Sequence, residues 1–415
     1  MLRCFLFLFL LVNNIASAKK VILYMDHATS PTMQQLMHFS EHADEKEIAF
    51  GFYFNRLEIK PELVSDLDDV YLVSKIDKEE LPFNHYLLSL LEKYPEGLEV
   101  DIHSNLHYSY GNIKPIISLE YENKKIKINH IYLYDDGSIE YEQFEKLRNE
   151  NIADRIVLQN KIFGDFVNKQ IDPQTQSKNF DYLLRHVYPA YYPTTYFYLR
   201  PDYVENEEFL QPLRDFYQQH HAKISTFSGD YFSKLSAKQQ DFYLKLINVE
   251  PAILKIFDND KRNFVFIGTN EKAFVNSDIN QVAKYQANLL KHYVDPKGLF
   301  YAGNDVKVYY KGHPAAKKLN ELVMHMVPDV SEIPAHISFN TLLMLNAKID
   351  YVVGMQSTIF LNLPKEQIGE IFFTDKHGKS REDLFNNPLV KIFQNLNNLS
   401  GKKIQKIEDL PMLIH

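Results

Sequence analysis

The chain has 415 residues, of which 45% are hydrophobic, with 29 Phe, 27 Tyr and a formal net charge of −8. This apolar content excludes a disordered chain, and the acidic balance argues against a nucleic-acid partner, which would require a basic surface. The length exceeds one ordinary hydrophobic core and predicts two domains of about 150 to 200 residues each.

The first 18 residues have the pattern of a secretory signal peptide. Arg3 provides a positive start, Cys4–Val12 form an unbroken apolar run, and Ala16–Ala18 supply small residues for cleavage. The apolar run is shorter than the roughly 20 residues of a membrane-spanning helix. We expect either a cleaved signal peptide with a periplasmic product or a retained anchor that associates the protein with one side of a membrane. Cys4 is the only cysteine, so the rest of the chain has no disulfide and no thiolate metal site.

Short apolar strands alternate with helical patterns in the first part of the chain. Strands are predicted at Val21–Met25, Glu47–Phe54, Val70–Val73, Leu98–Ile102 and Lys127–Tyr134. Helices are predicted between them at Thr32–His42, Pro82–Tyr94 and Tyr108–Glu122. Strands alternating with helices predict an α/β fold whose parallel sheet is covered on both faces.

A largely helical stretch follows at Glu140–Leu184, with polar breaks at Asp172–Ser177. The next segment, His186–Pro201, holds three prolines and six aromatic residues, which exclude both a regular helix and a loose tether. We interpret it as a packed crossing between two domains. The pattern then resumes with strands at Phe264–Gly268, Val306–Lys311, Tyr351–Gly354 and Ile371–Thr374, and helices at Val282–Tyr293, Ala315–Met326 and Phe339–Leu345.

These elements predict two doubly wound domains, 19–185 and 186–375, followed by a mixed segment of helix and loop at 376–415. Two such sheets facing each other enclose a cleft. Ligands of doubly wound sheets bind outside the carboxyl ends of the strands, so the residues that follow strands are the candidates for chemistry.

The predicted strand Lys127–Tyr134 ends in two carboxylates, Asp135 and Asp136, followed by Gly137 and Ser138. Adjacent carboxylates raise each other's pKa, which suits a general base that operates near neutral pH. The alternative is an ordinary turn followed by a helix cap. A metal site is a weaker interpretation, because no third ligand is evident.

Two strand ends in the second half are also polar. Lys311 and His313 follow a strand, where a Lys supplies positive charge and a His donates a proton or a hydrogen bond to an anionic leaving group. The alternative is a solvated loop closed by Pro314. Ser357 and Thr358 follow another strand, and hydroxyls with free N–H groups at a helix N-terminus bind phosphate, although both residues are also common helix caps. A carboxylate in one half and a phosphate-type site in the other indicate group transfer from a nucleotide.

These motifs resemble the bacterial sialyltransferases of glycosyltransferase family 80, of the multifunctional α-2,3/α-2,6 type. Tyr134–Ser138 and Lys311–Pro314 match the two signature motifs of that family. Further similar stretches lie at Glu207–Leu213, Ile333–Phe339 and Leu363–Glu366, so the resemblance covers nearly all of the chain after residue 18.

The resemblance implies a GT-B fold of two Rossmann-like domains, with residues 376–415 crossing back to the first domain. It also implies transfer of sialic acid from CMP-sialic acid to a galactoside hydroxyl, with inversion and without a metal or other cofactor. A galactose-terminated glycan, such as lipooligosaccharide, would be the acceptor, and the N-terminus would associate the enzyme with a membrane.

Residue roles carry over from the resemblance position by position. Asp136, or less favourably Asp135, would be the general base, and His313 would act on the departing phosphate as general acid or electrostatic stabiliser. Ser357 and Thr358 match a Ser-Ser pair that holds the donor phosphate. The complete set expected to bind the donor nucleotide is Lys311, Gly312, Pro314, Ser138, Pro334, Asn340, Ser357 and Thr358.

The sequence also departs from the family. Asn340 stands where the family has a Glu that grips the ribose hydroxyls, which removes a charge-assisted hydrogen bond. The protein has no Trp, and Lys272 stands near the position of the family's acceptor-stacking Trp. A family His on the acceptor side corresponds to Tyr108, with His107 beside it. Two alternatives therefore remain: a family member that uses another sugar nucleotide, and a degenerate member that binds nucleotide or glycan with little turnover.

Overall fold

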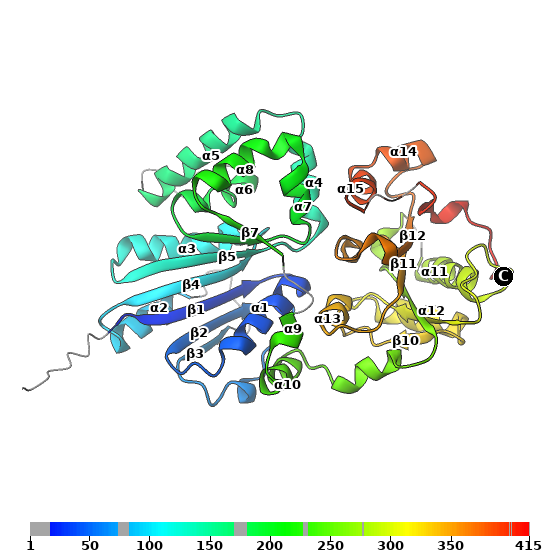
Figure 1. The fold of residues 1–415 in the computed structure, drawn as a ribbon, viewed down its shortest axis with the longest axis horizontal. Coiled ribbons are helices and arrows are strands. Elements are labelled where there is room, and N and C mark those ends of the chain that lie inside the picture. The colour runs from blue at the N-terminus through cyan, green and yellow to red at the C-terminus, as the bar shows by residue number, and fades with distance from the viewer. Residues whose placement is uncertain are drawn as a thin grey trace, which may run out of the picture.

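The structure is a computed structural model that describes residues 17–73, 83–169, 181–226, 231–275, 278–397, 399 and 401–414. Apart from Ser17 and Ala18, the predicted signal peptide or anchor lies outside these residues, as do the predicted polar break at Asp172–Ser177 and the start of the helix predicted at Pro82–Tyr94. The described residues form two domains, each built on one sheet (Figure 1).

The first sheet has seven described strands in the order β3-β2-β1-β4-β5-β6-β7, and every neighbouring pair is parallel. Strand β1, in the interior of this sheet, is almost completely buried from Val21 onward, because a parallel sheet is covered on both faces. The strands are β1 (Lys19–Asp26), β2 (Ile48–Phe54), β3 (Val70–Val73), β4 (Leu98–Asn105), β5 (Ile126–Tyr134), β6 (Thr194–Phe197) and β7 (Lys223–Ser225).

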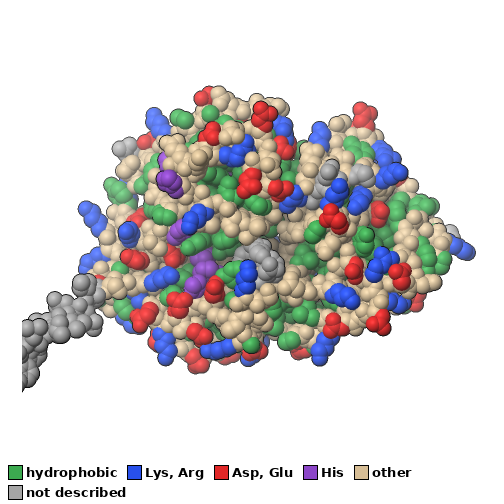
Figure 2. All heavy atoms as spheres, viewed as in Figure 1, with side chains coloured by type: hydrophobic (Ala, Val, Ile, Leu, Met, Phe, Trp, Pro, Cys, Tyr) green, Lys and Arg blue, Asp and Glu red, His purple; other side chains and the backbone are tan. Residues whose placement is uncertain are grey.

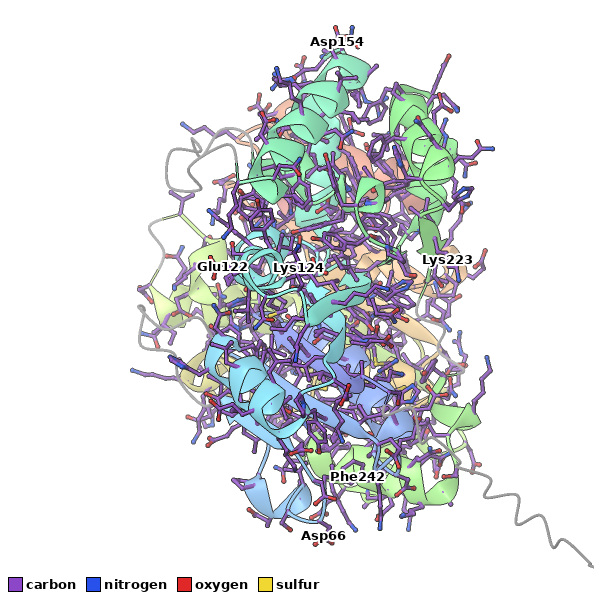
Figure 3. The ribbon with its side chains drawn as sticks, turned by 90° about the vertical axis from the view of Figure 1, so that its left-hand side faces the viewer. Asp66, Glu122, Lys124, Asp154, Lys223 and Phe242 are labelled. Carbon is purple, nitrogen blue, oxygen red and sulfur yellow. The ribbon has the colours of Figure 1, made fainter. Side chains whose placement is uncertain are left out.

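Helices cover both faces of this sheet (Figure 1). They are α1 (Thr29–His42), α2 (Asn84–Lys93), α3 (Ser109–Glu122), α4 (Ser138–Leu147), α5 (Ile152–Val167), α6 (Asp181–Leu184), α7 (Pro201–Asn206), α8 (Gln211–Gln219), α9 (Tyr231–Lys234) and α10 (Ala237–Leu246). Figure 3 places Asp154 on α5 and Phe242 on α10 at opposite ends of this domain. Helix α10 packs on α1.

The second sheet has six described strands in the order β10-β9-β8-β11-β12-β13, again all parallel. Its strands are β8 (Arg262–Ile267), β9 (Val306–Lys311), β10 (Ser331–Ile333), β11 (Tyr351–Met355), β12 (Ile368–Phe373) and β13 (Ile404–Lys406). Its helices are α11 (Ile279–Val294), α12 (Lys317–Met326) and α13 (Phe339–Met344), followed by α14 (Arg381–Asn386) and α15 (Pro388–Asn397).

The interpretation of His186–Pro201 as a crossing between domains is wrong. Its residues Thr194–Phe197 form β6, which pairs with β5 in the first sheet, and β7 extends the same sheet further. The aromatic residues of this segment are core residues of the first domain, since Tyr188 and Tyr196 are completely buried. The chain passes to the second sheet only after α10, so a boundary after residue 185 divides the first sheet.

The C-terminal segment returns to the first domain and then leaves it again. Helix α15 packs on α4, and the Arg200 guanidinium of the first domain donates to the Leu396 carbonyl oxygen. The chain then adds β13 to the edge of the second sheet beside β12. The larger of two apolar clusters connects the domains, because Phe360 and Phe393 belong to the same buried cluster as the residues of β1, while the second cluster lies within the second domain.

Figure 2 shows Lys and Arg side chains interspersed with Asp and Glu on the visible face of both domains, and a group of His side chains on the first domain. Helices long and apolar enough to cross a membrane do not occur in the described part of the chain.

Candidate active site

A pocket of about 320 Å³ lies between the two domains, outside the carboxyl ends of strands from both sheets. We call it the interdomain pocket. The first domain contributes Ala28, Thr29, Ser30, Asp136 and Leu199, and the second contributes Ile267, Gly268, Lys311, Gly312, His313, Pro314, Ser338, Phe339, Asn340, Ser357, Thr358 and Ile359. Eight predicted site residues therefore meet here: Asp136, Lys311, Gly312, His313, Pro314, Asn340, Ser357 and Thr358.

The two adjacent aspartates after β5 have different environments. Asp135 is buried and accepts hydrogen bonds from the Gly137 N–H (2.8 Å), the Tyr141 hydroxyl (2.5 Å) and the Leu199 N–H (3.2 Å). Burial raises the pKa of Asp135 to about 7, although these hydrogen bonds oppose the rise. Asp135 thus holds the turn in place, whereas Asp136 is only half-buried and lines the pocket.

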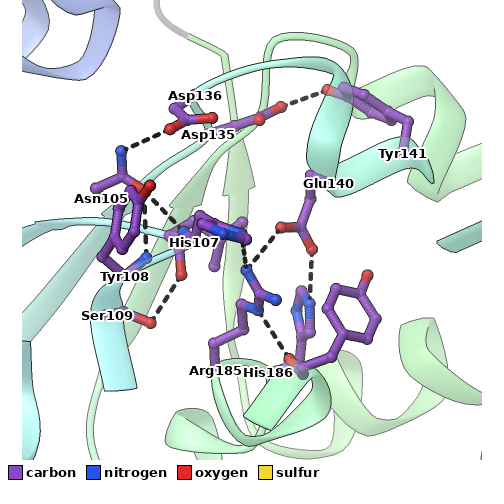
Figure 4. Close-up of polar contacts among 12 residues, drawn as sticks. Asn105, His107, Tyr108, Ser109, Asp135, Asp136, Glu140, Tyr141, Arg185 and His186 are labelled. Carbon is purple, nitrogen blue, oxygen red and sulfur yellow. Dashed lines mark hydrogen bonds and ion pairs between the residues drawn. The ribbon is translucent and has the colours of Figure 1, made fainter. Parts of the chain in front are cut away.

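Asn105, the last residue of β4, contacts Asp136 (Figure 4) and also binds a third carboxyl group. Its amide Nδ2 donates to Asp136 Oδ2 at 3.1 Å and to Asp26 Oδ1 at 3.2 Å. Asp26 ends β1, is completely buried and also accepts from Gln35 Nε2. Burial raises the pKa of Asp26 well above its usual value. The Asn105 amide therefore orients the Asp136 carboxylate from inside the first domain.

Gly137 brings the carboxylate turn into contact with the second domain. Its φ of +132° lies in a region that side chains rarely adopt, and a Cβ at this position would lie 2.0 Å from Thr358 Cγ2. The glycine is required both by the turn and by the close approach of Thr358. This contact places Asp136 opposite the Ser357–Thr358 strand end.

A buried ionic network lies beneath the first-domain wall (Figure 4). Glu140 in α4 binds Arg185 (3.3 Å) and His186 Nε2 (2.9 Å). Burial alone would raise the pKa of Glu140, but the charge of Arg185 and the His186 hydrogen bond outweigh it and lower the pKa to about 2. Arg185 Nη1 also lies 3.0 Å from His107 Nδ1. Because Arg only donates, His107 Nδ1 accepts, and the proton of the neutral ring is on Nε2.

His107 and Tyr108 begin a polar cluster near Asp136. The backbone N–H groups of His107 and Tyr108 both donate to Asn105 Oδ1, at 2.8 and 3.4 Å. The Tyr108 ring is exposed and lies 4.7 Å from the His27 ring, measured between centroids. His27 in turn contacts the side-chain amides of Asn55 and Asn112. Neither His107 nor Tyr108 lines the interdomain pocket itself.

In the second domain, Lys311 is the last residue of β9 and is buried. Its Nζ donates to the carbonyl oxygens of Gly312 (2.8 Å) and Ala335 (3.0 Å). Burial lowers the pKa of Lys311 to about 8, with Glu332 opposing the change. Lys311 therefore ties two loops of the pocket wall together and carries most of its positive charge at neutral pH.

His313 is fixed by its neighbours. Its Nδ1 accepts from the Ala315 N–H at 3.2 Å, so the neutral ring carries its proton on Nε2. The Nε2 atom lies 3.5 Å from Asn270 Nδ2, which is too long for a strong hydrogen bond. Burial first and then the charge of Lys311 lower the pKa of His313. Asn320 holds the His313 carbonyl at 2.9 Å and packs so closely on Gly312 that a Cβ there would lie 2.3 Å from its side chain.

Ser357 and Asn340 complete this wall. Ser357 caps the short 3₁₀ helix Thr358–Leu361, where its Oγ accepts from the Ile359 N–H. Asn340 is in the first turn of α13, and its Oδ1 accepts from Asn362 Nδ2 at 2.9 Å. Ser357, Thr358 and Ile359 therefore line the interdomain pocket together with His313.

The remaining predicted site residues lie outside the interdomain pocket. Asp135 is buried behind it, Ser138 is the first residue of α4, and Pro334 follows β10. Lys272 is exposed in a short 3₁₀ turn, and its carbonyl accepts from Lys376 Nζ. Sequence reasoning missed Asp26 and Asn105, although both end strands and the strand-end rule could have found them.

Protein metal sites need several ligand side chains that converge on one point. Within the described ranges, no group of three or more His, Cys, Asp or Glu side chains has the arrangement of a metal site. Asp26 and Asp136 share the Asn105 amide instead of converging on a common point. The carboxylates present are thus held by hydrogen bonds from the protein.

Comparison with solved structures identifies the architecture. The chain superposes with a TM-score of 0.84 and 27% identity on a Photobacterium sp. JT-ISH-224 2,6-sialyltransferase solved with the donor product CMP and the acceptor lactose, covering 95% of this chain and 80% of that one. The GT-B domain of a Photobacterium damselae sialyltransferase gives 0.82 and 26%, covering 93% of this chain and 99% of that one. The chain, with its two parallel sheets, therefore has the GT-B fold that the resemblance implied.

A Photobacterium phosphoreum α/β-galactoside α-2,3-sialyltransferase shares the fold, with a TM-score of 0.78 at 23% identity over 95% of this chain and all of that one. No curated protein sequence matches the chain. The family model described as "Sialyltransferase PMO188" matches residues 21–405. With both domains and the pocket between them inside that match, the chain belongs to this sialyltransferase family and is a glycosyltransferase.

Proposed function

We propose that this sialyltransferase transfers sialic acid from CMP-sialic acid to a galactoside hydroxyl, with inversion at the anomeric carbon and without a metal ion or other cofactor. The observation that carries the proposal is the interdomain pocket, which has Asp136 on one wall and His313, Ser357 and Thr358 on the other. The CMP and lactose bound to the Photobacterium sp. JT-ISH-224 enzyme support the same two substrate classes.

Asp136 is the general base of the proposed reaction. The acceptor hydroxyl oxygen forms a bond to the anomeric carbon of sialic acid while the bond from that carbon to the CMP phosphate breaks. The hydroxyl proton passes to the Asp136 carboxylate, and CMP leaves with the bonding electron pair. Attack on the face opposite the phosphate inverts the anomeric carbon, which fits a base and a leaving-group site on opposite walls.

His313 stabilises the departing phosphate. Because its Nδ1 accepts from Ala315, the neutral imidazole presents Nε2–H, and an anion bound there would also favour the doubly protonated ring. The hydroxyls of Ser357 and Thr358 and the N–H groups at the start of their helix add hydrogen bonds to the phosphate. Lys311 supplies the positive charge behind them. These groups compensate the leaving-group charge, which is the reason a metal ion is not needed in this proposal.

The acceptor binds on the first-domain side, next to Asp136. The exposed Tyr108 ring offers an apolar face for a sugar ring, and His27, Asn55 and His107 supply polar groups around it. A galactose-terminated glycan such as lipooligosaccharide is the acceptor class we propose. We further propose that the N-terminal segment associates the enzyme with a membrane, where such a lipid-linked acceptor is found.

The experiment is an assay of CMP release and product formation with CMP-sialic acid and lactose, in the presence and absence of a chelator. Transfer should be unaffected by the chelator, and NMR of the product should show the α-anomer formed from the β-linked donor. Asp136→Ala and His313→Ala should each lower kcat by about 10² to 10⁴, the usual range for a lost acid–base group. The proposal is wrong if the protein gives neither transfer nor donor hydrolysis with several galactosides, and other sugar nucleotides should then be assayed as donors.

A further inference from the structure

The ends of three adjacent strands of the first sheet bring Asp26, Asn105 and Asp136 together. Strand β4 lies between β1 and β5, and its parallel register with β1 places Asn105 beside Asp26 at the ends of the two strands. On its other side Asn105 pairs with Tyr134, which ends β5, and Asp136 follows two residues later. Of these three polar side chains, Asp136 lines the interdomain pocket, and the other two lie behind it.

The Asn105 amide is held in one orientation by four hydrogen bonds. One of its atoms faces the backbone N–H groups of His107 and Tyr108 (Figure 4), and because these groups only donate, that atom must be the oxygen Oδ1. The other atom, Nδ2, has two hydrogens, one for Asp26 Oδ1 and one for Asp136 Oδ2. Every polar position of this buried amide has a partner, so the amide cannot turn without losing hydrogen bonds.

Asp26 holds this amide from inside the first domain. Its carboxyl group is completely buried and accepts hydrogen bonds from three parts of the chain. Oδ1 accepts from the Ala28 N–H at 2.6 Å and from Asn105 at 3.2 Å, and Oδ2 accepts from Gln35 Nε2 of α1 at 2.9 Å. Without this carboxyl group, one hydrogen of Asn105 Nδ2 would be buried without a partner, and the amide would be free to tilt.

The arrangement leaves one oxygen of Asp136 for the reaction. Oδ2 accepts from Asn105, whereas Oδ1 makes no hydrogen bond with the residues that the structure describes. In the proposed reaction the proton of the acceptor hydroxyl therefore passes to Oδ1. Since both oxygens belong to one planar group, a tilt of the Asn105 amide would move Oδ1 relative to the acceptor.

We propose that Asp26 is a positioning residue for the transfer reaction, which acts through Asn105 to direct Asp136 Oδ1 at the acceptor hydroxyl. Asp26 does not line the interdomain pocket, so it should affect the rate of transfer and not the binding of the donor. This inference rests on the proposed function, because it takes Asp136 as the general base. The alternative is a purely structural role, in which Asp26 Oδ1 and the Ala28 N–H form the turn that leads into α1.

Three substitutions of Asp26 separate the two roles. Asp26→Asn keeps an acceptor oxygen for Ala28 and Asn105. Its new NH₂ group can donate to Gln35 Oε1, which has no partner in the described residues, once the Gln35 amide turns over. Asp26→Ser keeps an acceptor for the turn with Ala28, but its side chain is too short to reach Asn105. Asp26→Ala loses both contacts.

The readouts are kcat and KM with CMP-sialic acid and lactose, the Kd of CMP from calorimetry, and the unfolding temperature. Asp26→Ser and Asp26→Ala should lower kcat by about 10- to 100-fold, because a misplacement of about 1 Å costs about 10²-fold in rate. The KM for the donor and the Kd of CMP should stay within about twofold, and Asp26→Asn should keep kcat within about threefold of the unchanged protein. In a purely structural role, Asp26→Ser would keep kcat as well.

A double-mutant cycle tests the path through Asn105. Asn105→Ala removes the hydrogen bond to Asp136 and should lower kcat by about 100-fold. Because Asp26 acts through the same amide, Asp26→Ser should lower kcat no further in the Asn105→Ala background. Asp101→Ser is the matched control. Asp101 is also a buried carboxylate of β4 that accepts from an asparagine of the neighbouring strand, Asn129 Nδ2 at 2.8 Å, but it does not line the interdomain pocket. Its substitution should lower the unfolding temperature and leave kcat unchanged.

Two results would overturn the inference. If Asp26→Ser keeps the kcat of the unchanged protein, Asp26 only forms the turn. If the losses of Asp26→Ser and Asn105→Ala multiply in the double variant, Asp26 acts independently of Asn105. The proposed function fails in a different way: the unchanged protein then neither binds CMP nor catalyses transfer, or Asp136→Ala retains full activity, and the inference is overturned with it.

Discussion

Gly137→Ala is the most direct test of how the two walls of the pocket are brought together. The new Cβ would lie 2.0 Å from Thr358 Cγ2, whereas carbon atoms in contact are about 3.5 to 4.0 Å apart. The φ of Gly137, +132°, is also unfavourable for alanine. To relieve this overlap, the second domain would have to move away by about 1.5 Å, or the turn at Asp135–Gly137 would have to shift by a similar distance.

The expected magnitude follows from this displacement. A misplacement of about 1 Å between catalytic groups costs about 10²-fold in rate, so kcat/KM should fall by about 100-fold, equivalent to about 2.7 kcal/mol. The unfavourable φ adds about 1 to 3 kcal/mol to the free energy of the folded turn. The first effect concerns the relative position of the walls, and the second concerns stability, so the two are measured separately.

A double-mutant cycle separates the steric contact from the backbone strain. Thr358→Ser removes Cγ2 but keeps the hydroxyl, so alone it should leave kcat/KM within about twofold of the unchanged enzyme. In Gly137→Ala/Thr358→Ser the nearest remaining Thr358 atoms, Cβ and Oγ1, would lie 3.0 Å from the new Cβ, and at least tenfold of the lost kcat/KM should return. Steady-state kinetics with thermal unfolding of all four proteins provide both readouts.

The cycle also contains the result that refutes the reasoning. If Gly137→Ala keeps kcat/KM within about threefold, the close approach of Gly137 and Thr358 is not required for catalysis. If its kcat/KM is low but Thr358→Ser restores nothing, the loss comes from the turn alone and not from the position of the second domain.

Three further predictions concern titratable groups. Burial lowers the pKa of His38 to about 3, so its charged form is disfavoured in the folded state, and His38 alone should lower the unfolding free energy by about 2 kcal/mol between pH 8 and pH 5. In urea denaturation, His38→Gln should show a smaller fall than the unchanged protein over this pH range, and an equal fall would contradict the assignment. Asp135→Asn keeps the size of the side chain but weakens the hydrogen bonds that it accepts from Gly137, Tyr141 and Leu199. We expect kcat to fall at least tenfold while the pH optimum stays the same. A shifted pH optimum would instead make Asp135 the general base. Because the pKa of Lys311 is lowered to about 8, the KM for the donor should rise as the pH increases through 8. Lys311→Arg should move that rise to higher pH, because arginine keeps its charge. If the rise does not move, the charge of Lys311 does not assist donor binding.

The long buried strands were predictable from the sequence because their apolar runs leave no other interpretation. Strands such as β1, β2 and β9 appear within one or two residues of the predicted bounds. The short strands β6, β7, β10 and β13 were missed, because a segment of three or four residues carries little periodicity, although the four-residue strand β3 was predicted with its bounds. The aromatic residues of β6 indicate burial, but the sequence does not reveal whether they pack in the first domain, where β6 pairs with β5, or between the two domains.

Some residues of the candidate site were also predictable from the sequence, and others were not. Asp136, His313 and Ser357 were predictable because each follows a strand, and the carboxyl ends of parallel strands meet. The Glu140–Arg185 pair was not, since two residues far apart on different elements leave no local pattern. The contact between Gly137 and Thr358 joins opposite halves of the chain and depends on the packing of whole domains.

The route of the C-terminal segment has a consequence for how the molecule unfolds. Because α15 lies on α4 while the strands before and after it belong to the second sheet, the chain passes between the domains three times in all. Neither half can lose its structure without pulling α15 away from the other, and one of the two apolar clusters contains residues of both halves. Heat denaturation should therefore follow a single cooperative transition whose calorimetric and van't Hoff enthalpies agree.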